Sequence, residues 1–399
     1  MSQQQLAAPP GLLRGTLEIA RREMAYMLKT PKLLLIMFAF PVLAITLFNL
    51  LYSQHVILHI RTAVWDANQT ALSRQVVEAF ADSDRFDLVA NVNSEREIRQ
   101  LLDTRQVEAA LVIPADFSRD LQRGQSSKVL VIVNGSNMLF SNAVLSSATE
   151  IVSTISAGST IVKLESMGLP PDSALKTVQP VELALRIWYN PTFNYANFLV
   201  LGLLATTIQQ VTLLYMATSL VREKAAGTLA ALREQGYSAL AVLLGKYGVY
   251  FTANFLTLNL LLASCVYWFN IPFNGSLPQL MLLEVVFLGG ILALGTFLSL
   301  VSRNELEATQ LSMVIALPSF LFSGYTWPVQ AMPPLCRAIS ALLPLTYFAG
   351  NLRDIALMDI SFSTMQHDLL VLAGLVAVFL PLSALLFQRQ YGRLSAENK

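Results

Sequence analysis

The segment VREKAAGTLAALREQGYSALAVLLGK, residues 221–246, separates two long apolar runs of the chain. Its first 14 residues hold three bases and two acids. Leu229 and Leu232 stand three apart and share one face of a helix, and Gly236 can adopt the left-handed conformation that ends one. The sequence therefore predicts a short charged helix at 222–236, directly after an apolar run.

The composition is that of a membrane protein. Of the 399 residues, 54% are hydrophobic and 13% charged, whereas a soluble globular chain is usually about one quarter charged. The formal net charge of +1 gives no indication of nucleic-acid binding. The two cysteines, Cys265 and Cys336, have the spacing of neither a disulfide framework nor a metal site. We therefore expect no metal site and no catalytic residues on this chain.

Six apolar runs predict membrane-spanning helices. A helix needs roughly 20 apolar residues to cross the hydrocarbon, and each span must be helical because lipid offers no partner for free backbone groups. The runs are residues 33–51, 195–220, 241–269, 277–301, 306–325 and 369–387. The expected fold is an α-helical polytopic membrane protein with six transmembrane helices, the first at 33–52 and the other five within 193–388.

Lysine and arginine predict the orientation of these spans. Thirteen bases fall in segments on one side of the membrane: Arg14, Arg21, Arg22, Lys29, Lys32, Arg222, Lys224, Arg233, Lys246, Arg303, Arg389, Arg393 and Lys399. Apart from the long first loop, the opposite segments carry only Arg337 and Arg353. The thirteen bases are expected in the cytoplasm, which places both termini there, with residues 389–399 as a cytoplasmic tail.

The long loop at 53–192 is expected to be an α/β domain outside the membrane. It holds 15 of the 26 acidic residues. ILHIRTAVWD, FDLVANV, VEAALVIP and KVLVIVNG have the β-branched content and alternation of strands, and TALSRQVVEAFADS, SEREIRQLLDTRQ and PADFSRDLQRG predict helices between them. Ser94 and Glu97 form a capping box, Gly124 can end a helix, and a long helix is expected at 143–167. The domain is either a folded spacer or a surface for docking or substrate handling.

Residues 1–32 contain an amphipathic helix. Its apolar positions repeat at intervals of three and four: Leu13, Leu17, Ala20, Met24, Met27 and Leu28. Its charged positions lie opposite: Arg14, Glu18, Arg21 and Arg22. We expect this helix to lie in the cytoplasmic membrane interface and to end before Pro31.

The helix at 222–236 is either a solvated connector or a contact that transmits movement. A connector needs only a turn, since most links between helices are short. A capped helix joined directly to a span suits a contact with another protein. In such a contact Gly227 would allow close backbone approach, and Leu229 and Leu232 would fill a groove of the partner as apolar anchors.

Two motifs resemble those of permease subunits of type-two ATP-binding-cassette (ABC) exporters. In that family a Glu-Lys-x-x-Gly-Thr-Leu segment forms the coupling helix, and a Gly-Lys pair opens the next span. The matching residues are Arg222, Glu223, Lys224, Gly227, Thr228, Leu229, Gly245 and Lys246. Gln235 and Gly236 depart from the Thr-Pro that the family often has there. The second motif is matched by Ser323, Gly324, Pro328, Met332, Pro333, Pro344, Leu345, Thr346, Tyr347 and Arg353. LVIPADFSRDLQRG and WYNP also resemble the subgroup with a large extracytoplasmic domain.

The prolines of residues 326–350 exclude one continuous helix in the second motif. We expect short helices that dip into the outer leaflet, with their backbone buried in protein. In the family this re-entrant segment closes the pathway from outside. The alternative is an ordinary outer loop with a proline-rich turn.

The resemblance implies a permease subunit that does not hydrolyse ATP. The segment LLGKYG lacks the first glycine of a nucleotide-binding loop and has Tyr247 in place of Ser or Thr. No cofactor is therefore expected on this chain; ATP and magnesium would bind a separate cytoplasmic ABC ATPase. A second permease copy or a homologue would complete the pathway in the bacterial inner membrane, for export of an amphipathic drug, lipid or peptide. A periplasmic adaptor protein and membrane lipids are further expected partners.

Three groups of residues are candidates for these functions. The ATPase-coupling group is Arg222, Glu223, Lys224, Gly227, Thr228, Leu229, Leu232, Arg233 and Lys246. The outer re-entrant gate is Gly324, Pro328, Met332, Pro333, Pro344 and Tyr347. Polar groups in spans more often form inter-helix hydrogen bonds, but those of the second and fifth spans are candidates for the pathway: Thr206, Gln209, Gln210, Thr309, Gln310 and Ser312.

Two other classes of membrane protein stay open on the residues alone. An ion-coupled secondary transporter usually needs charged groups in mid-membrane, and the one clear carboxylate in the expected spans is Glu284. A membrane-anchored receptor or scaffold would be built around the outer domain, although six spans are more than an anchor needs. Co-purification with an ATPase would separate the three classes.

Overall fold

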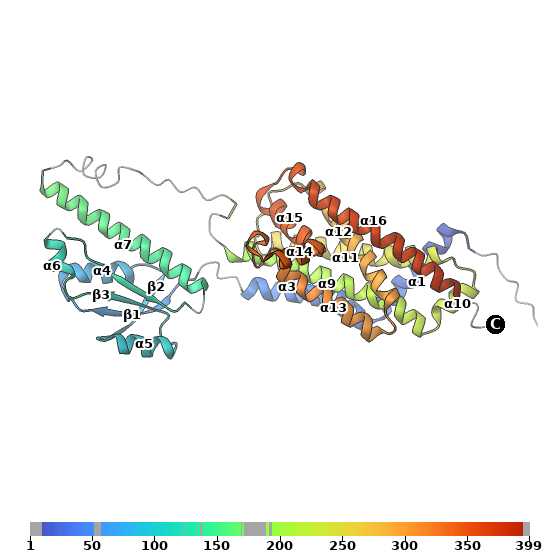
Figure 1. The fold of residues 1–399 in the computed structure, drawn as a ribbon, viewed down its shortest axis with the longest axis horizontal. Coiled ribbons are helices and arrows are strands. Elements are labelled where there is room, and N and C mark those ends of the chain that lie inside the picture. The colour runs from blue at the N-terminus through green and yellow to red at the C-terminus, as the bar shows by residue number, and fades with distance from the viewer. Residues whose placement is uncertain are drawn as a thin grey trace, which may run out of the picture. The chain divides into compact units, whose positions relative to one another are not determined.

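The computed structural model describes residues 10–51, 57–123, 125–135, 138–168, 170, 189–190 and 194–393. The chain divides into two compact units, one made of Met1–Ser53 with Trp188–Lys399 and the other of Gln54–Ile187 (Figure 1). The first unit is helical and the second is α/β, and each is described by itself.

The helical unit has a helix at each of the six expected spans. Its N-terminal part comprises α1 (Leu12–Lys29), α2 (Pro31–Leu34), the π-helix η1 (Leu35–Ala39) and α3 (Phe40–Leu51). The remainder comprises α9 (Tyr195–Ala225), α10 (Thr228–Glu234), α11 (Ala239–Tyr267), α12 (Leu277–Val301), α13 (Glu305–Phe322), η2 (Val329–Ala331), α14 (Pro334–Leu342), α15 (Pro344–Met358) and α16 (Phe362–Arg393). Asn194, Ser238 and Asn304 cap α9, α11 and α13, because each side chain accepts a bond from a backbone N–H of the first turn.

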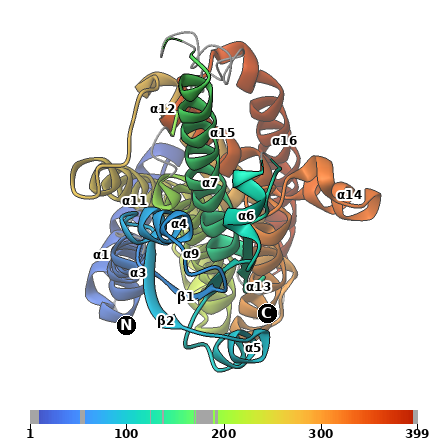
Figure 2. The same cartoon turned by 90° about the vertical axis from the view of Figure 1, so that its left-hand side faces the viewer.

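Helix α9 lies at the centre of this unit. It packs against α3, α11, α12, α13 and α15, and Figure 2 shows it between α1 and α3 on one side and α13 on the other. The approach of α9 to α12 requires Gly295, where a Cβ would lie 2.8 Å from Met216 and 3.2 Å from the Leu213 carbonyl oxygen. Helix α1 approaches α11 equally closely at Gly245, where a Cβ would lie 2.9 Å from the Thr16 carbonyl oxygen. Glycine at these two positions lets the backbones of the paired helices come into close contact, as in other packed membrane helices.

The amphipathic helix expected in residues 1–32 is α1. Leu13 and Leu17 of its expected apolar face are 81% and 71% exposed, as in a helix whose apolar side meets lipid, whereas Met27 of that face is buried. A second face, which carries Ile19 and Glu23, is buried and packs along α11. The helix is therefore part of the bundle as well as amphipathic.

Six helices in the described part of the chain are long and apolar enough to cross a membrane by length and composition: Pro31–Leu51, Met138–Ser166, Tyr195–Ala225, Ala239–Tyr267, Leu277–Val301 and Phe362–Arg393. Five of them match expected spans, and the protein is a multi-pass membrane protein. The set differs from the expected one in a single helix. Helix α13 is absent from it, because Glu305 and Glu307 and several polar residues lower its hydropathy, and α7 (Met138–Ser166) of the α/β unit takes its place.

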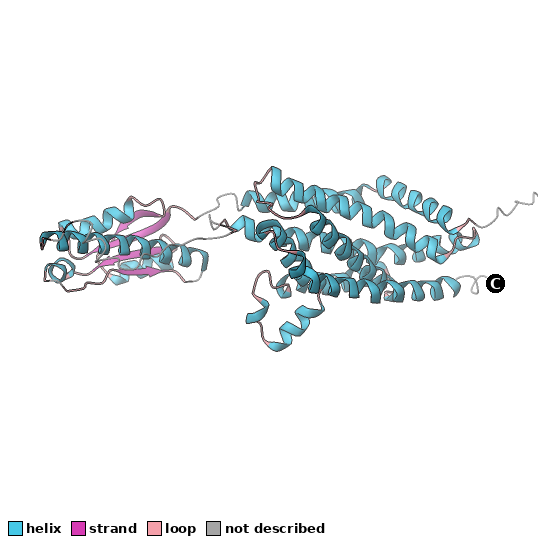
Figure 3. Ribbon diagram, turned by 90° about the horizontal axis from the view of Figure 1, so that it is seen from above, coloured by secondary structure: helices cyan, strands magenta, loops and turns pink. Residues whose placement is uncertain are grey.

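The α/β unit has the four expected strands and the helices expected between them. In chain order they are β1 (Ile60–Asp66), α4 (Ala71–Ala81), β2 (Phe86–Asn91), α5 (Glu95–Asp103), β3 (Ala109–Ile113), α6 (Phe117–Gln122), β4 (Leu130–Val133) and α7. The sheet order is β2-β1-β3-β4; β1 is parallel to β2 and β3, and β4 is antiparallel to β3. The strands are magenta in Figure 3.

Both faces of this sheet are covered. Val76 and Phe80 of α4 and Val144 of α7 pack on one face, and Ile98 of α5 packs on the other. Figure 1 shows α4 and α7 on one side of the strands and α5 on the opposite side. The capping interaction expected at α5 is present, since Ser94 Oγ accepts a bond from the Glu97 N–H at 3.3 Å. The sheet therefore has a core of its own on each side.

Some expectations fall outside the described residues. They concern Gly124 as the end of a helix, most of residues 168–192 at the end of the expected outer domain, and the tail beyond residue 393. The long helix expected at 143–167 is described, and it begins earlier, at Met138.

Candidate functional site

The charged segment at 222–236 is not one helix, so this expectation was wrong. Arg222, Glu223 and Lys224 belong to the last turn of α9, and Gly227 has a left-handed backbone with φ 70° that separates α9 from α10. No atom lies within 4 Å of a Cβ built on Gly227, so its role within the chain is this turn and not close packing. Gly236, with φ 84°, ends the segment as expected.

Leu229 and Leu232 lie in the core of this chain. Each is 4% exposed, and both belong to a cluster with side chains of α1, α9, α11, α12 and α16. The expectation that they reach into a groove of another protein was wrong, because helix α10 lies across helices of its own chain and buries its apolar face there.

The end of α10 is attached to α1 and α16. The Tyr237 hydroxyl donates to Glu18 Oε2 of α1 at 2.7 Å, and the Tyr391 hydroxyl of α16 donates to the Tyr237 carbonyl oxygen at 3.1 Å. Arg233 donates to the Tyr391 carbonyl oxygen, and its guanidinium carbon lies 5.8 Å from the centroid of the Tyr391 ring. A shift of α10 would therefore displace the two helices attached to its end, α1 and α16.

Beside α10 lies a buried ion pair between α1 and α11. Lys246 and Glu23 are 0% and 2% exposed, and the Lys246 Nζ lies 2.8 Å from Glu23 Oε2. The Tyr250 hydroxyl donates to the other Glu23 oxygen at 2.8 Å. Burial alone would raise the pKa of Glu23, but the Lys246 charge beside it and the bonds from Lys246 and Tyr250 hold that pKa below its ordinary value. Glu23 is therefore a carboxylate at neutral pH.

The end of α9 joins this pair. Lys246 Nζ lies 3.3 Å from Glu223 Oε1, and Arg22 of α1 also pairs with Glu223. Arg222 Nη2 lies 3.8 Å from Glu23 Oε1, and the Arg222 guanidinium carbon lies 4.4 Å from the centroid of the Tyr26 ring. We call Arg22, Glu23, Arg222, Glu223 and Lys246 the ion cluster. It connects α1 with the helix that enters the charged segment and the helix that leaves it.

The candidate coupling residues other than Leu229 and Leu232 divide into two sets. Glu223 and Lys246 are buried in the ion cluster, and Arg222 is partly buried there. Lys224 and Gly227 are exposed, while Thr228 and Arg233 are half-buried. The sequence reasoning missed Glu23, although it carried a signal: Glu23 stands four residues from Ile19 and from Met27, on the face of α1 that is otherwise apolar or small.

Residues 326–350, the expected outer segment, form short helices, as their prolines predict. Pro333 precedes α14, and Pro344 opens α15. Gly324 has φ 82° at the turn after α13, Met332 is buried, and Pro328 and Pro333 are exposed. The Tyr347 hydroxyl donates to the Ala341 carbonyl oxygen at 2.8 Å, which ties α15 to α14.

Tyr325, which the sequence reasoning did not single out, attaches this segment to α9. Its ring stacks on Phe198 at 5.2 Å and lies against Gly202. Its hydroxyl donates to the Phe198 carbonyl oxygen. The aromatic residue next to Gly324 in the sequence was the available signal.

The six candidate pathway residues lie on α9 and α13, which pack against each other. Three of their hydroxyls bond to carbonyl oxygens of their own helix, those of Thr206, Thr309 and Ser312. Gln209 is fully buried, and its amide has no hydrogen-bond partner among the described residues. Gln310 is exposed and Gln210 is half-buried. The six residues therefore differ in burial and in hydrogen bonding, and their role in a pathway stays a prediction.

Glu284 of the fourth expected span is also buried. Its Oε2 accepts a bond from the Asn259 side chain of α11 at 2.8 Å, and its Oε1 has no partner among the described residues. The pair joins α11 to α12.

Comparison with known proteins identifies the family. The model of the family described as ABC-2 family transporter protein matches residues 31–385. The chain belongs to the ABC-2 transporter family. This confirms the resemblance to type-two ABC permeases and the function it implied, a permease subunit of an ABC exporter.

Relatives of this ABC-2 protein include permeases of Escherichia coli and a protein of Dictyostelium discoideum. The chain is 26% identical to the probable multidrug ABC transporter permease YbhR of E. coli over 82% of this chain and 86% of that protein. It is also 26% identical to the probable multidrug ABC transporter permease YbhS, over 82% of each chain. ABC transporter G family member 20 of D. discoideum is 29% identical over 47% of this chain and 25% of that protein.

Proposed function

We propose that this ABC-2 permease receives movement from a separate cytoplasmic ABC ATPase at the coupling turn, residues 224–235. The observation that carries the proposal is the ion cluster. Lys246 after the turn pairs with Glu223 before it and with Glu23 of α1, and Arg222 also pairs with Glu23. A push on α10 would therefore move α9, α11 and α1 together. Gly227 and the exposed side of α10 would form the contact, and Leu229 and Leu232 would hold α10 to its own chain.

We infer the other parts of the transporter from the family and its relatives. ATP and magnesium would bind the ATPase, with no hydrolysis on the permease. A second copy or a homologous permease would complete a pathway through the inner membrane. Two relatives are named as multidrug permeases, which favours an amphipathic drug as substrate over a lipid or peptide. The outer segment around Gly324 and Tyr325 would close the pathway on the far side, and the α/β unit would dock a periplasmic adaptor.

Bulky residues on the coupling turn should remove the ATPase without unfolding the permease. Ala226 and Ala231 are exposed, so tryptophan can replace both without entering the core. Blocking a central contact typically weakens binding by about 2 kcal/mol or more, roughly 30-fold. A native pull-down of the wild-type chain should contain an ATPase, a second permease and an adaptor. The Ala226→Trp, Ala231→Trp variant should lose the ATPase alone, together with ATP-driven efflux of an amphipathic dye.

The matched control places tryptophan at Ala331 and Ala341, which are exposed in the outer segment. This control should retain the ATPase at the wild-type level. Retention of the ATPase by the coupling-turn variant would show that the contact lies elsewhere. A wild-type pull-down with no ATPase would reject the proposed partner.

A cysteine-labelling experiment tests the proposed orientation. The distribution of thirteen bases against two favours a cytoplasmic coupling turn and an α/β unit outside. With Cys265 and Cys336 replaced by serine, a cysteine at the exposed position Asp103 should react with a membrane-impermeant thiol reagent in intact cells. A cysteine at exposed Ala226 should react only after the cells are opened. The reverse pattern would invert the proposed topology.

A further inference from the structure

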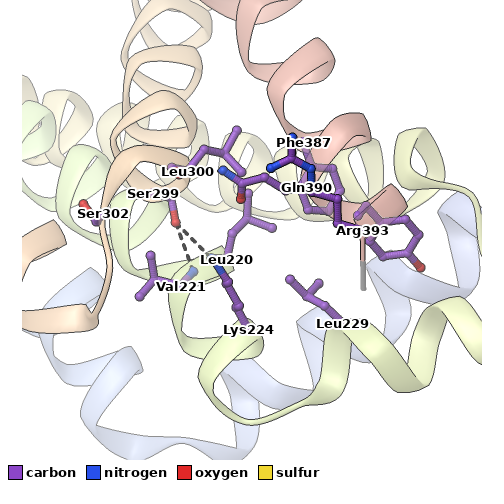
Figure 4. Close-up of a pocket in the computed structure, with 11 residues that line it drawn as sticks. Leu220, Val221, Lys224, Leu229, Ser299, Leu300, Ser302, Phe387, Gln390 and Arg393 are labelled. Atoms are coloured by element: carbon purple, nitrogen blue, oxygen red, sulfur yellow. Dashed lines mark hydrogen bonds between the residues drawn. The ribbon is translucent and has the colours of Figure 1, made fainter. Parts of the chain in front are cut away.

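A cavity of about 290 Å³ lies beside helix α10. Its walls come from the ends of α9, α12 and α16 and from Leu229 of α10. Figure 4 shows Lys224 and Leu229 on one side of this space, opposite Phe387, Gln390 and Arg393 of α16. We call it the α10–α16 cavity.

The rim of the α10–α16 cavity is basic. Lys224 and Arg393 line it and are exposed, and no acidic residue lines it. Within the described part of the chain, neither base makes an ion pair. Two free cations on opposite walls favour an anion between them.

The inner part of the cavity is apolar, and its polar groups already have partners. Leu229 and Phe387 are 4% and 1% exposed. Ser299 Oγ accepts bonds from the Leu220 and Val221 N–H groups at 3.2 Å. The Gln390 amide donates to the Leu300 carbonyl oxygen at 2.9 Å, which covers one of the carbonyl groups at the end of α12. The cavity therefore suits a ligand with an anionic group at the rim and an apolar part inside.

The level of the cavity relative to the membrane indicates the class of ligand. It lies at the last turns of α9, α12 and α16, three helices that are each long and apolar enough to cross a membrane. The ends of such helices stand at the level of the lipid headgroups, and basic pockets between membrane helices bind anionic headgroups. A zwitterionic lipid would add a third cation beside Lys224 and Arg393.

We propose that the α10–α16 cavity binds an anionic phospholipid, with the phosphate between Lys224 and Arg393 and the first methylene groups against Leu229 and Phe387. Bound there, the lipid bridges α10 and α16, so it holds the coupling turn against the bundle. The assignment of the lipid to the cytoplasmic leaflet rests on the proposed orientation. The binding of the lipid does not depend on that orientation.

Native mass spectrometry of the purified full chain in detergent tests this site. Phosphatidylglycerol and phosphatidylcholine are titrated against the wild type and the Lys224→Gln, Arg393→Gln variant. The wild type should prefer phosphatidylglycerol, and the variant should bind it roughly 30-fold more weakly, about fivefold for each base. The control variant Arg21→Gln, Arg303→Gln removes the same charge at two exposed bases outside the cavity, and it should bind as the wild type does.

Each other outcome overturns the proposal. Equal binding of the two lipids, or equal loss in the control variant, would show adsorption to the whole basic surface. Full competition by glycerol phosphate, which has no acyl chains, would assign the cavity to a soluble anion. Because no ATPase and no transport enter the assay, its failure would leave the proposed coupling function untouched.

Discussion

Replacement of Lys246 by methionine should destabilise the detergent-solubilised protein by about 3–5 kcal/mol, the range for a buried ion pair that loses one partner. Lys246 is fully buried and lies 2.8 Å from Glu23 and 3.3 Å from Glu223. Its loss leaves two buried carboxylates whose remaining partners, Arg22 and Arg222, are 38% and 22% exposed. Thermal unfolding monitored by circular dichroism should show the loss.

A double variant distinguishes this electrostatic effect from loss of packing. Glu23→Gln combined with Lys246→Met removes both charges of the central pair, and neutral replacement of a whole buried pair is often tolerated. The double variant should therefore be more stable than Lys246→Met alone. Lys29→Met, at an exposed base of α1, should change stability by less than about 0.5 kcal/mol. Additive losses in the double variant would mean that the pair contributes no coupling energy.

Replacement of both Leu229 and Leu232 by alanine should also unfold the region around α10. A buried leucine that becomes alanine typically costs about 2–5 kcal/mol, and both side chains lie in one cluster with Ile19, Phe387 and Tyr391. The measured melting temperature should fall, and the ATPase should be lost from the pull-down as a consequence.

The control for the leucines is Gln235→Ala, an exposed change at the end of α10 that should leave the melting temperature within error of the wild type. If the leucine variant lost the ATPase and kept its wild-type melting temperature, the leucines would be interface anchors after all. Stability and partner binding therefore have to be measured on the same preparations.

Local pattern was sufficient for most of the fold. The apolar runs predicted the helices, and alternation in segments such as VEAALVIP predicted the strands, because both signals depend on near neighbours in the sequence. Composition alone does not separate α7 from the expected spans. Helix α7 is apolar enough to cross a membrane, yet Val144 and Ala148 belong to the core of the α/β unit, and only the tertiary fold shows which surface covers an apolar helix.

The candidate site was harder to predict because its contacts join distant residues. The motif identified Glu223 and Lys246 but not Glu23, which lies 223 positions from Lys246 in the sequence. Leu229 and Leu232 were recognised as one apolar face, and their spacing carries no information about whether a partner or the chain itself covers that face. Sequence therefore located the coupling turn and misassigned its anchors.

The backbone turns at Gly227 and Gly236 set the length of helix α10. Leu229 and Leu232 set how closely the helix packs against the rest of the chain. The exposed positions Ala231, Glu234 and Gln235 determine neither the length of the helix nor its packing. Folding therefore places little constraint on which residues occupy these three positions. In evolutionary terms, duplicated permeases could acquire separate ATPases through a few exposed changes, while selection on the glycines and leucines keeps the shape of the helix constant.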